Sequence, residues 1–191
     1  MHIGLYFGSF NPIHNGHLAI AQYMYTNYNF DEIWFVISPN SPFKQEKDML
    51  NANIRLQLVQ IAIENIPFFK ASDIEFDMPT PSYTYRTLRK IRKLYPNNQY
   101  SIIMGGDNID NIHLWKNYTE IIQNHTIYIY PRIESKNITY SHHCIIAPNV
   151  PILNISASEI RTLIRQTNWE KVAKLVPEKV FLTLKNKKYY Q

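Results

Sequence analysis

Two histidines three residues apart, His14 and His17, occur in the segment GSFNPIHNGH over residues 8–17. The segment follows a short apolar run and precedes an amphipathic stretch, so we expect it to join a strand to a helix. The N–H groups and the dipole of a helix N-terminus bind phosphate. Two imidazoles near a phosphate can stabilise the charge that builds up in phosphoryl transfer. The residues expected to contact the phosphates are Gly8, Ser9, Phe10 and Gly16.

Two other interpretations of this segment are a structural turn with surface histidines and a zinc site. The glycines, the proline and the paired histidines between a strand and a helix form a composite pattern that a simple turn does not need. A zinc site lacks nearby cysteine or carboxylate ligands. Phosphate binding is therefore the favoured hypothesis.

A second motif, ISASEIR, spans residues 155–161. Ser156 and Glu159 fit a capping box, and the alternative interpretation is a well-capped helix and nothing more. Arg161 favours a function, because a cation in the first turns of a helix is unfavourable to the macrodipole. A bound polyphosphate would explain this arginine, whose planar fork can bond two oxygens.

The elements expected around these motifs alternate between strand and helix. Strands are predicted over residues 2–7, 32–38, 69–76, 100–104, 126–130 and 144–147. Helices are predicted over 16–28 (capped by Asn15), around Ile54–Ala62, over 83–94, in short pieces over 109–123, and over 158–165, 169–175 and 177–184. This pattern predicts one α/β domain over residues 1–191 with a doubly wound parallel sheet. Ligands bind at the carboxyl ends of such strands.

The net charge of +5 suits anionic partners. Three of these charges lie in the run KNKK over residues 185–188, which is expected to be a solvated tail. A nucleic-acid-binding protein is the rival of another class, but no basic and aromatic face is visible outside this tail. A single cysteine, the absence of a secretory signal pattern and the absence of a long apolar run predict a cytoplasmic protein that does not span a membrane.

The two motifs HxGH and ISxSxIR resemble the nucleotidyltransferase superfamily, and within it the bacterial nicotinate mononucleotide adenylyltransferases. The resemblance extends from Ile3 to Arg161. It implies a Rossmann-like nucleotidyltransferase fold with a small C-terminal helical segment. It also implies transfer of an adenylyl group from ATP, which brings Mg²⁺ with it, to nicotinate mononucleotide.

Three middle segments resemble the family as well. The segment SPNSPFK over residues 38–44 resembles a loop that ends in a phosphate-binding lysine. The segment PSYTYRTL over 81–88 resembles the part whose backbone N–H groups receive the nicotinate carboxylate. The segment GGDNI over 105–109, followed by Trp115, resembles the part that binds ribose and stacks on the pyridine ring.

The resemblance assigns roles to individual residues. The catalytic candidates are His14, His17, Lys44 and Arg161. To the phosphate-contacting residues above it adds as ATP-binding candidates Gly105, Asp107, Ile155, Ser156 and Ser158. The mononucleotide candidates are Asn40, Thr84, Tyr85, Trp115 and Arg132, although Arg132 could equally be a surface residue. No residues are assigned to a protein-held metal.

The sequence departs from the family pattern at Phe7, Asn11 and Phe43, where a glycine, an aspartate and a histidine are usual. Other acceptors within the superfamily stay open. They are nicotinamide mononucleotide, phosphopantetheine and the acceptors of cytidylyltransferases. The SYT segment and the GDN segment with its tryptophan argue against phosphopantetheine and against the cytidylyltransferase acceptors.

Overall fold

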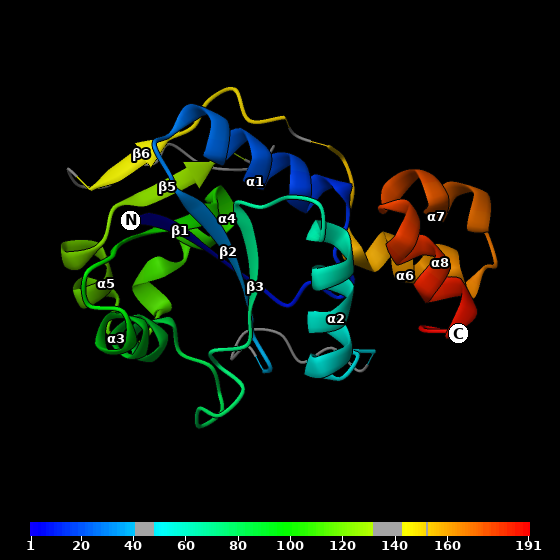
Figure 1. The fold of residues 1–191 in the computed structure, drawn as a ribbon, viewed down its shortest axis with the longest axis horizontal. Coiled ribbons are helices and arrows are strands. Elements are labelled where there is room, and N and C mark those ends of the chain that lie inside the picture. Colours follow the sequence, from blue (N-terminus) through cyan, green and yellow to red (C-terminus); the bar gives the residue numbers. More distant parts are fainter. Residues whose placement is uncertain (41–47, 132–142, 152) are drawn as a thin grey trace.

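A parallel β-sheet forms the centre of the computed structural model, which describes residues 1–40, 48–131, 143–151 and 153–191. Within these residues six strands lie in the order β3-β2-β1-β4-β5-β6, and every neighbouring pair is parallel. The strands are β1 (His2–Gly8), β2 (Glu32–Ile37), β3 (Phe69–Ser72), β4 (Gln99–Gly105), β5 (Ile127–Tyr130) and β6 (Cys144–Ile146). The predicted doubly wound parallel sheet is confirmed (Figure 1).

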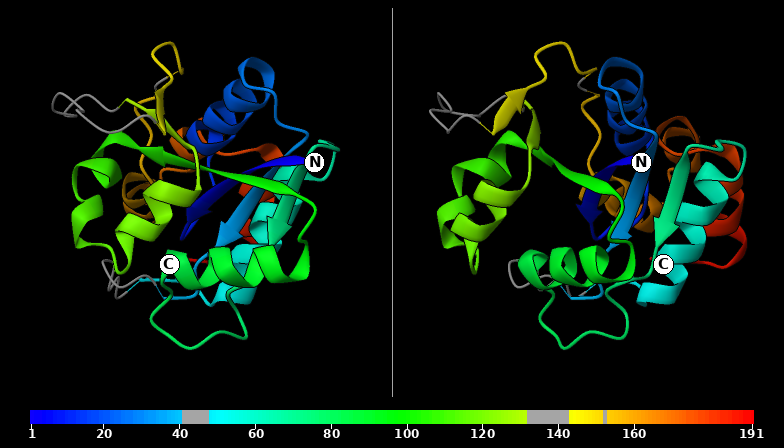
Figure 2. Two further views of the ribbon diagram at one scale, coloured as in Figure 1. Left: turned by 90° about the vertical axis from the view of Figure 1, so that its left-hand side faces the viewer. Right: turned by 60° about the vertical axis from the view of Figure 1, so that its left-hand side comes forward.

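Helices cover both faces of the sheet (Figure 2). One core cluster holds buried residues of α1 (Asn15–Asn27) and α2 (Ala52–Ile63), together with α6 (Ala157–Arg165), α7 (Trp169–Leu175) and α8 (Glu178–Asn186). The other holds residues of α3 (Thr84–Leu94), α4 (Gly106–Asp110), the 3₁₀ turn Ile112–Leu114 and α5 (Tyr118–Asn124). Helices α6, α7 and α8 gather at one end of the molecule, where α2 contacts α8 (Figure 1).

The central strand β1 is buried on both faces because its side chains alternate between the two clusters. Ile3 and Leu5 are fully buried in one cluster, and Tyr6 is buried in the other. Each such aliphatic side chain stabilises the fold by about 1.5–3 kcal/mol. The strand order turns back between β1 and β4, so the crevice beyond their carboxyl ends is the expected ligand site.

Several element boundaries differ from the prediction, among them the following three. Helix α1 begins at Asn15 rather than being capped by it, and His14 takes the N-cap position while the Asn15 amide donates to Lys174 O at 3.1 Å. Strand β3 ends at Ser72 instead of residue 76, because the chain turns there and Phe76 N–H donates to Asp73 O at 2.8 Å. The short helical pieces begin at residue 106, earlier than the predicted 109.

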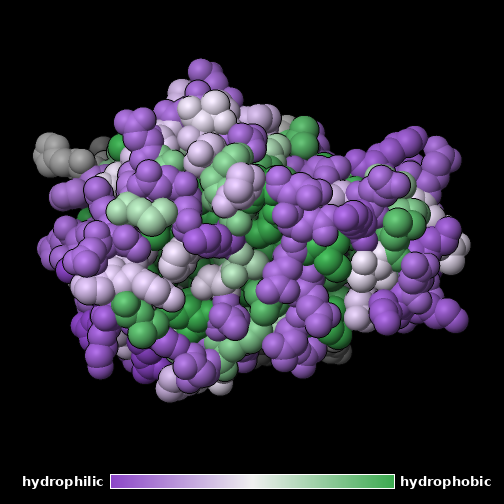
Figure 3. Space-filling model, in the orientation of Figure 1, coloured by the Kyte–Doolittle hydropathy of each residue, from purple (hydrophilic) through white to green (hydrophobic). Residues whose placement is uncertain are grey.

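The surface drawn in Figure 3 is mostly hydrophilic, with apolar residues visible between the polar ones near the middle of that face. In the part of the chain that the structure describes, no helix combines the length and the apolar character that crossing a membrane requires.

Candidate active site

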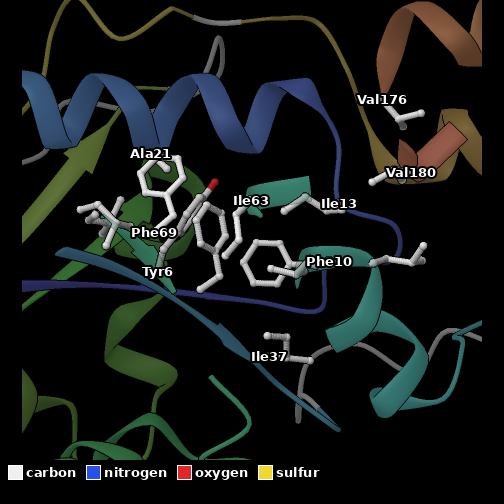
Figure 4. Packing of buried hydrophobic residues seen from close by; sticks show 14 of the residues in the cluster. Tyr6, Phe10, Ile13, Ala21, Ile37, Ile63, Phe69, Val176 and Val180 are labelled. Carbon is white, nitrogen blue, oxygen red and sulfur yellow. The ribbon is translucent and has the colours of Figure 1, made fainter. Parts of the chain in front are cut away.

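The loop after β1 is held in shape by an aromatic core. Phe10 has a left-handed backbone with φ of 46°, a conformation that costs on the order of 1 kcal/mol or more for a residue with a side chain. Its ring is buried and packs edge-on against Tyr6 at 5.7 Å and Phe35 at 5.5 Å between ring centroids. Figure 4 shows the Phe10 ring among the buried side chains of the core. A Cβ atom on Gly8 would lie 2.8 Å from this ring, so a side chain at position 8 would disturb the packing.

The two histidine rings lie against each other at the start of α1. The rings of His14 and His17 stack with centroids 3.7 Å apart and an interplanar angle of 26°. A Cβ atom on Gly16 would lie 3.0 Å from His14 Nδ1, so the absence of a side chain at this position makes room for the imidazole. The His17 ring also meets Phe10 and Tyr6 edge-on, at 5.1 and 6.1 Å between centroids. The histidines therefore form one unit between the core and the site.

The C-terminal motif lies beside this first loop, 150 residues away along the chain. Arg161 is buried, and its guanidinium donates to Asn11 O at 2.8 Å and to Ser158 Oγ at 3.3 Å. The predicted cap of the helix is present, since Ser156 Oγ accepts from Glu159 N–H at 3.1 Å. Ile155 approaches the start of α1, with its Cβ 3.8 Å from the position a Cβ on Gly16 would take.

Asn11, where the family usually has an aspartate, connects the first loop to three other segments. Its Oδ1 accepts from Leu50 N–H at 3.1 Å and from the Tyr190 hydroxyl at 2.6 Å, and its Nδ2 donates to Asp48 O at 3.2 Å. Its carbonyl is the acceptor of the Arg161 bond. An amide can donate and accept at once, whereas an ionised carboxylate only accepts. The asparagine therefore suits the donation to Asp48 O.

The end of β4 brings Asp107 to the same edge of the sheet. A Cβ on Gly105 would lie 2.4 Å from Asp107 Oδ1 and 3.2 Å from the Tyr130 ring, so a side chain at this position would displace the Asp107 carboxylate. The Tyr130 hydroxyl lies 3.4 Å from that of Tyr6, which links the ends of β5 and β1 across β4.

A cavity of about 140 Å³ opens at the carboxyl ends of β1, β2 and β4. Four of the predicted site residues line it, namely Gly8, Ser9, Thr84 and Trp115. It is also lined by residues that the sequence analysis did not single out, among them Tyr6, Ser38, Ser82, Tyr83, Asn108, Lys116 and Tyr130. Lys116 is exposed at the rim, with its Nζ 5.2 Å from the centre of the Tyr83 ring. Its position directly after Trp115 was the sequence signal that could have identified it.

Helix α3 begins at this cavity. Thr84 and Tyr85 are its first two residues, so their backbone N–H groups lie in the turn where a helix has no internal acceptors. The Tyr85 side chain itself is buried in the core cluster and does not line the cavity. The role of Tyr85 as a mononucleotide candidate stays a prediction. Successive helical side chains point about 100° apart, so Tyr85 cannot share the direction of Thr84.

Three further predicted residues are Asn40, Lys44 and Arg132, of which the structure describes Asn40. Asn40 is exposed after β2, and its carbonyl accepts from the N–H of Ser82, a cavity residue, at 2.9 Å. Lys44 and Arg132 lie outside the described residues.

A buried carboxyl group lies behind the cavity. Glu75 is almost fully buried, and its Oε1 accepts from Thr87 Oγ1 at 2.7 Å. Burial raises the pKa of Glu75 above its ordinary value, and hydrogen bonding from Thr87 and from the cavity residues Ser38 and Ser82 offsets part of this rise. In the sequence, Glu75 falls within the predicted strand over residues 69–76, and nothing there marks its carboxyl group as buried.

Groups of three or more metal-ligating side chains are absent from the described ranges, which omit residues 41–47, 132–142 and 152. The polar groups that meet at the strand ends are histidines, backbone N–H groups, hydroxyls and an arginine. Donors of this kind bind phosphate rather than a bare cation.

The fold and this loop-to-helix arrangement are those of a nucleotidyltransferase. Residues 5–163 match the family model described as cytidylyltransferase-like. The chain is 42% identical to a protein of Flavobacterium psychrophilum and 43% identical to one of Flavobacterium johnsoniae, each over 194 residues and all of both chains. Both relatives are named "Probable nicotinate-nucleotide adenylyltransferase". The chain belongs to this family of nucleotidyltransferase enzymes.

A solved structure shares the fold. The nicotinic acid mononucleotide adenylyltransferase of Plasmodium falciparum, complexed with NaAD, superposes with a TM-score of 0.81 at 22% identity. The match covers 99% of this chain and 97% of that chain.

Proposed function

We propose that the protein transfers the adenylyl group of ATP to nicotinate mononucleotide. The 5′-phosphate oxygen of the mononucleotide attacks the α-phosphorus in line, the bond to the β-phosphate bridging oxygen breaks, and pyrophosphate leaves. Nicotinate adenine dinucleotide is the product. A general base is not required, because the second pKa of a phosphate monoester is about 6 and the nucleophile is mostly ionised at neutral pH.

The observation that carries this proposal is that the histidine pair and Arg161 both contact the loop that follows β1, whose Gly8 and Ser9 line the cavity. Arg161 reaches the first loop through Asn11, and His17 contacts Tyr6, which lines the cavity. Positioned cationic and N–H donors of this kind stabilise charge on a transferring phosphoryl group. In the proposed roles His17 contacts the α-phosphate and His14 helps to hold the triphosphate. Arg161 and Ser158 hold the leaving pyrophosphate.

The residues around the cavity favour an acceptor molecule that carries a pyridine ring with a carboxylate. Trp115 offers an aromatic face for stacking, and the N–H groups of Thr84 and Tyr85 at the start of α3 favour an anion. Lys116 adds a positive charge at the rim, which also favours a carboxylate over an amide. Asp107 is proposed to accept from ribose hydroxyls, and adenine to lie between Gly105 and Ile155.

The remaining roles rest on the family resemblance. Lys44 is proposed to neutralise phosphate charge, and Asn40 and Arg132 to contact the mononucleotide. Mg²⁺ enters as the Mg·ATP complex, held by phosphate oxygens and water, as this ion prefers. A cytoplasmic location stays a prediction from the sequence.

The test is pyrophosphate release by the purified protein with Mg·ATP. Nicotinate mononucleotide, nicotinamide mononucleotide and phosphopantetheine are offered in parallel. We expect a clear preference for the first. A preference for another acceptor would contradict the assignments of Thr84 and Trp115 and leave the histidine chemistry standing. No release with any acceptor would contradict the proposed reaction itself.

A further inference from the structure

Arg55 is a charged side chain buried near the N-terminal end of α2. Among the residues that the structure describes it is the largest fully buried side chain, with 1% of its surface exposed. It lies in the first turn of the helix, which begins at Ala52. A cation is unfavourable there, because the positive end of the helix dipole lies at the N-terminus. Burial of an unpaired guanidinium is also costly. Contacts outside α2 must therefore account for its position.

Those contacts are backbone carbonyls of three separate segments. Arg55 Nη1 donates to Ser9 O at 2.6 Å and to Ser38 O at 2.9 Å, and Nη2 donates to Pro39 O at 3.1 Å. Its Nε donates to Leu50 O at 2.9 Å, in the chain that enters α2. Four of the five N–H groups of the guanidinium are therefore used on main-chain oxygens.

Two of the three segments that Arg55 joins are the loops at the mouth of the cavity. Strands β1 and β2 are paired as far as Gly8 and Ile37, and the Ser38 N–H still donates to Gly8 O at 3.0 Å. Beyond this bond the two segments leave the sheet, and Arg55 donates hydrogen bonds to the carbonyl groups of both. Ser9 and Ser38 line the cavity, whereas Arg55 does not. The guanidinium thus sets the distance between the two loops without lining the cavity itself.

The same bonds fix the direction of the loop peptides. The Ser9–Phe10 peptide is trans, so its N–H points opposite to its C=O. The carbonyl faces Arg55, and the Phe10 N–H is therefore directed away from the cation. The guanidinium carries a full positive charge. It therefore also adds a fixed positive field behind a loop proposed to hold phosphate.

We propose that Arg55 is a positioning residue for adenylyl transfer, which holds the Ser9 and Ser38–Pro39 loops at the spacing that the bound nucleotides require. The proposal rests on the proposed function. A lysine could not replace this residue, because an ammonium is a point charge without the planar fork that reaches several carbonyls. A small displacement of groups that orient reacting phosphates can cost about a hundredfold in rate.

The test compares Arg55→Lys with Leu58→Ala by steady-state kinetics at a temperature where circular dichroism shows both to be folded. Leu58 lies on the same helix, is 1% exposed and belongs to the hydrophobic core, so its truncation destabilises the protein without removing a hydrogen bond to the loop carbonyls. We expect Arg55→Lys to lower kcat/KM for ATP at least about tenfold. The kcat/KM of Leu58→Ala for ATP should stay within about twofold of wild type, even where its melting temperature falls as far as that of Arg55→Lys.

A rescue experiment separates positioning from stability. In Arg55→Ala, added methylguanidinium should restore part of the lost turnover in a saturable manner, and methylammonium at the same concentration should not. If Arg55→Ala does not fold, Arg55→Lys alone decides. Wild-type kinetic constants in Arg55→Lys, or a loss equal to that of Leu58→Ala at matched melting temperature, would overturn the proposal.

Failure of the proposed reaction can be told apart from failure of this inference. If the wild-type protein turns over none of the acceptors, affinity for a non-hydrolysable ATP analogue replaces the kinetic measurement. Weaker binding by Arg55→Lys than by Leu58→Ala supports the role of Arg55 in the loops, and equal binding contradicts it.

Discussion

His14 and His17 differ in what surrounds them, although their rings stack. His17 contacts Tyr6 and Phe10, and Tyr6 lines the cavity, whereas His14 is buried at the N-cap of α1 beside Gly16. His17 is therefore the better placed of the two to meet a reacting phosphate, and His14 to support its ring.

Replacement of His17 by alanine should act on turnover more than on binding. We expect kcat to fall by about a hundredfold or more, as for loss of one charge-stabilising donor, with a much smaller change in KM for ATP. The measurement is pyrophosphate release under saturating acceptor. His143→Ala, which removes an exposed imidazole outside the cavity, is the control. Near-normal kcat in His17→Ala would remove His17 from the catalytic group.

Replacement of Glu75 by glutamine should change the pH dependence of stability. The pKa of Glu75 is raised in the folded protein, so folding favours the protonated acid. That contribution is fully present below the ordinary pKa of 4.5 and is lost as pH rises through the folded pKa. Glutamine does not titrate.

The unfolding free energy of the Glu75→Gln variant should therefore improve relative to wild type as pH rises from about 4 toward neutrality, by about 1.4 kcal/mol for each unit of pKa shift. Urea unfolding across this pH range measures the difference, with Glu178→Gln as the exposed control. A difference that is the same at every pH would contradict the raised pKa.

At the scale of elements, the strands were predictable because buried parallel strands contain continuous apolar runs, such as residues 33–37 of β2. The end of β3 was not, because Ser72 and Asp73 form a local turn that the apolar pattern of residues 74–76 conceals. The HxGH and ISxSxIR motifs were recognisable because each lies at the start of a helix and its residues are close together in the sequence. Arg55 was not recognisable, because a single charged residue in a helical stretch indicates a solvated face until tertiary contacts are known.

The cap of α6 is expected to stabilise the protein measurably. Ser156 Oγ accepts the Glu159 N–H, and loss of such a cap costs about 1 kcal/mol. Ser156→Ala should lower the unfolding free energy by that amount in urea titration. Ser156→Thr, which keeps an acceptor, should recover most of the loss. Equal stability of all three proteins would show that the cap contributes nothing.

At the scale of the whole molecule, the candidate site depends on contacts between distant parts of the chain. Tyr190 donates to Asn11 across 179 positions and Arg161 does so across 150. Sequence patterns describe neighbours along the chain, so neither partner of Asn11 could be named before the structure. The C-terminal helices are thereby part of the support of the first loop.

The Tyr190 hydroxyl should contribute about 1 kcal/mol to stability through this hydrogen bond. Tyr190→Phe keeps the ring and removes the bond, and thermal unfolding compares it with Tyr189→Phe, whose neighbouring ring also packs on the core. We expect a lower melting temperature only for the first. An equal shift in both variants would mean that ring packing, rather than the bond to Asn11, is what matters.

The attachment of the first loop to Arg161 has a consequence for folding kinetics. Contacts between residues far apart in sequence form late, because closing a long loop costs entropy before the contact repays it. The pairing of β1 with β2 joins residues 29 positions apart (Ile3 and Glu32) and that of β1 with β4 joins residues 97 positions apart (His2 and Gln99), whereas the Asn11–Arg161 bond spans 150. During refolding the β-sheet should therefore form while the loop after β1 still lacks its hydrogen bond to Arg161. Enzymatic activity should then return more slowly than the β-sheet signal.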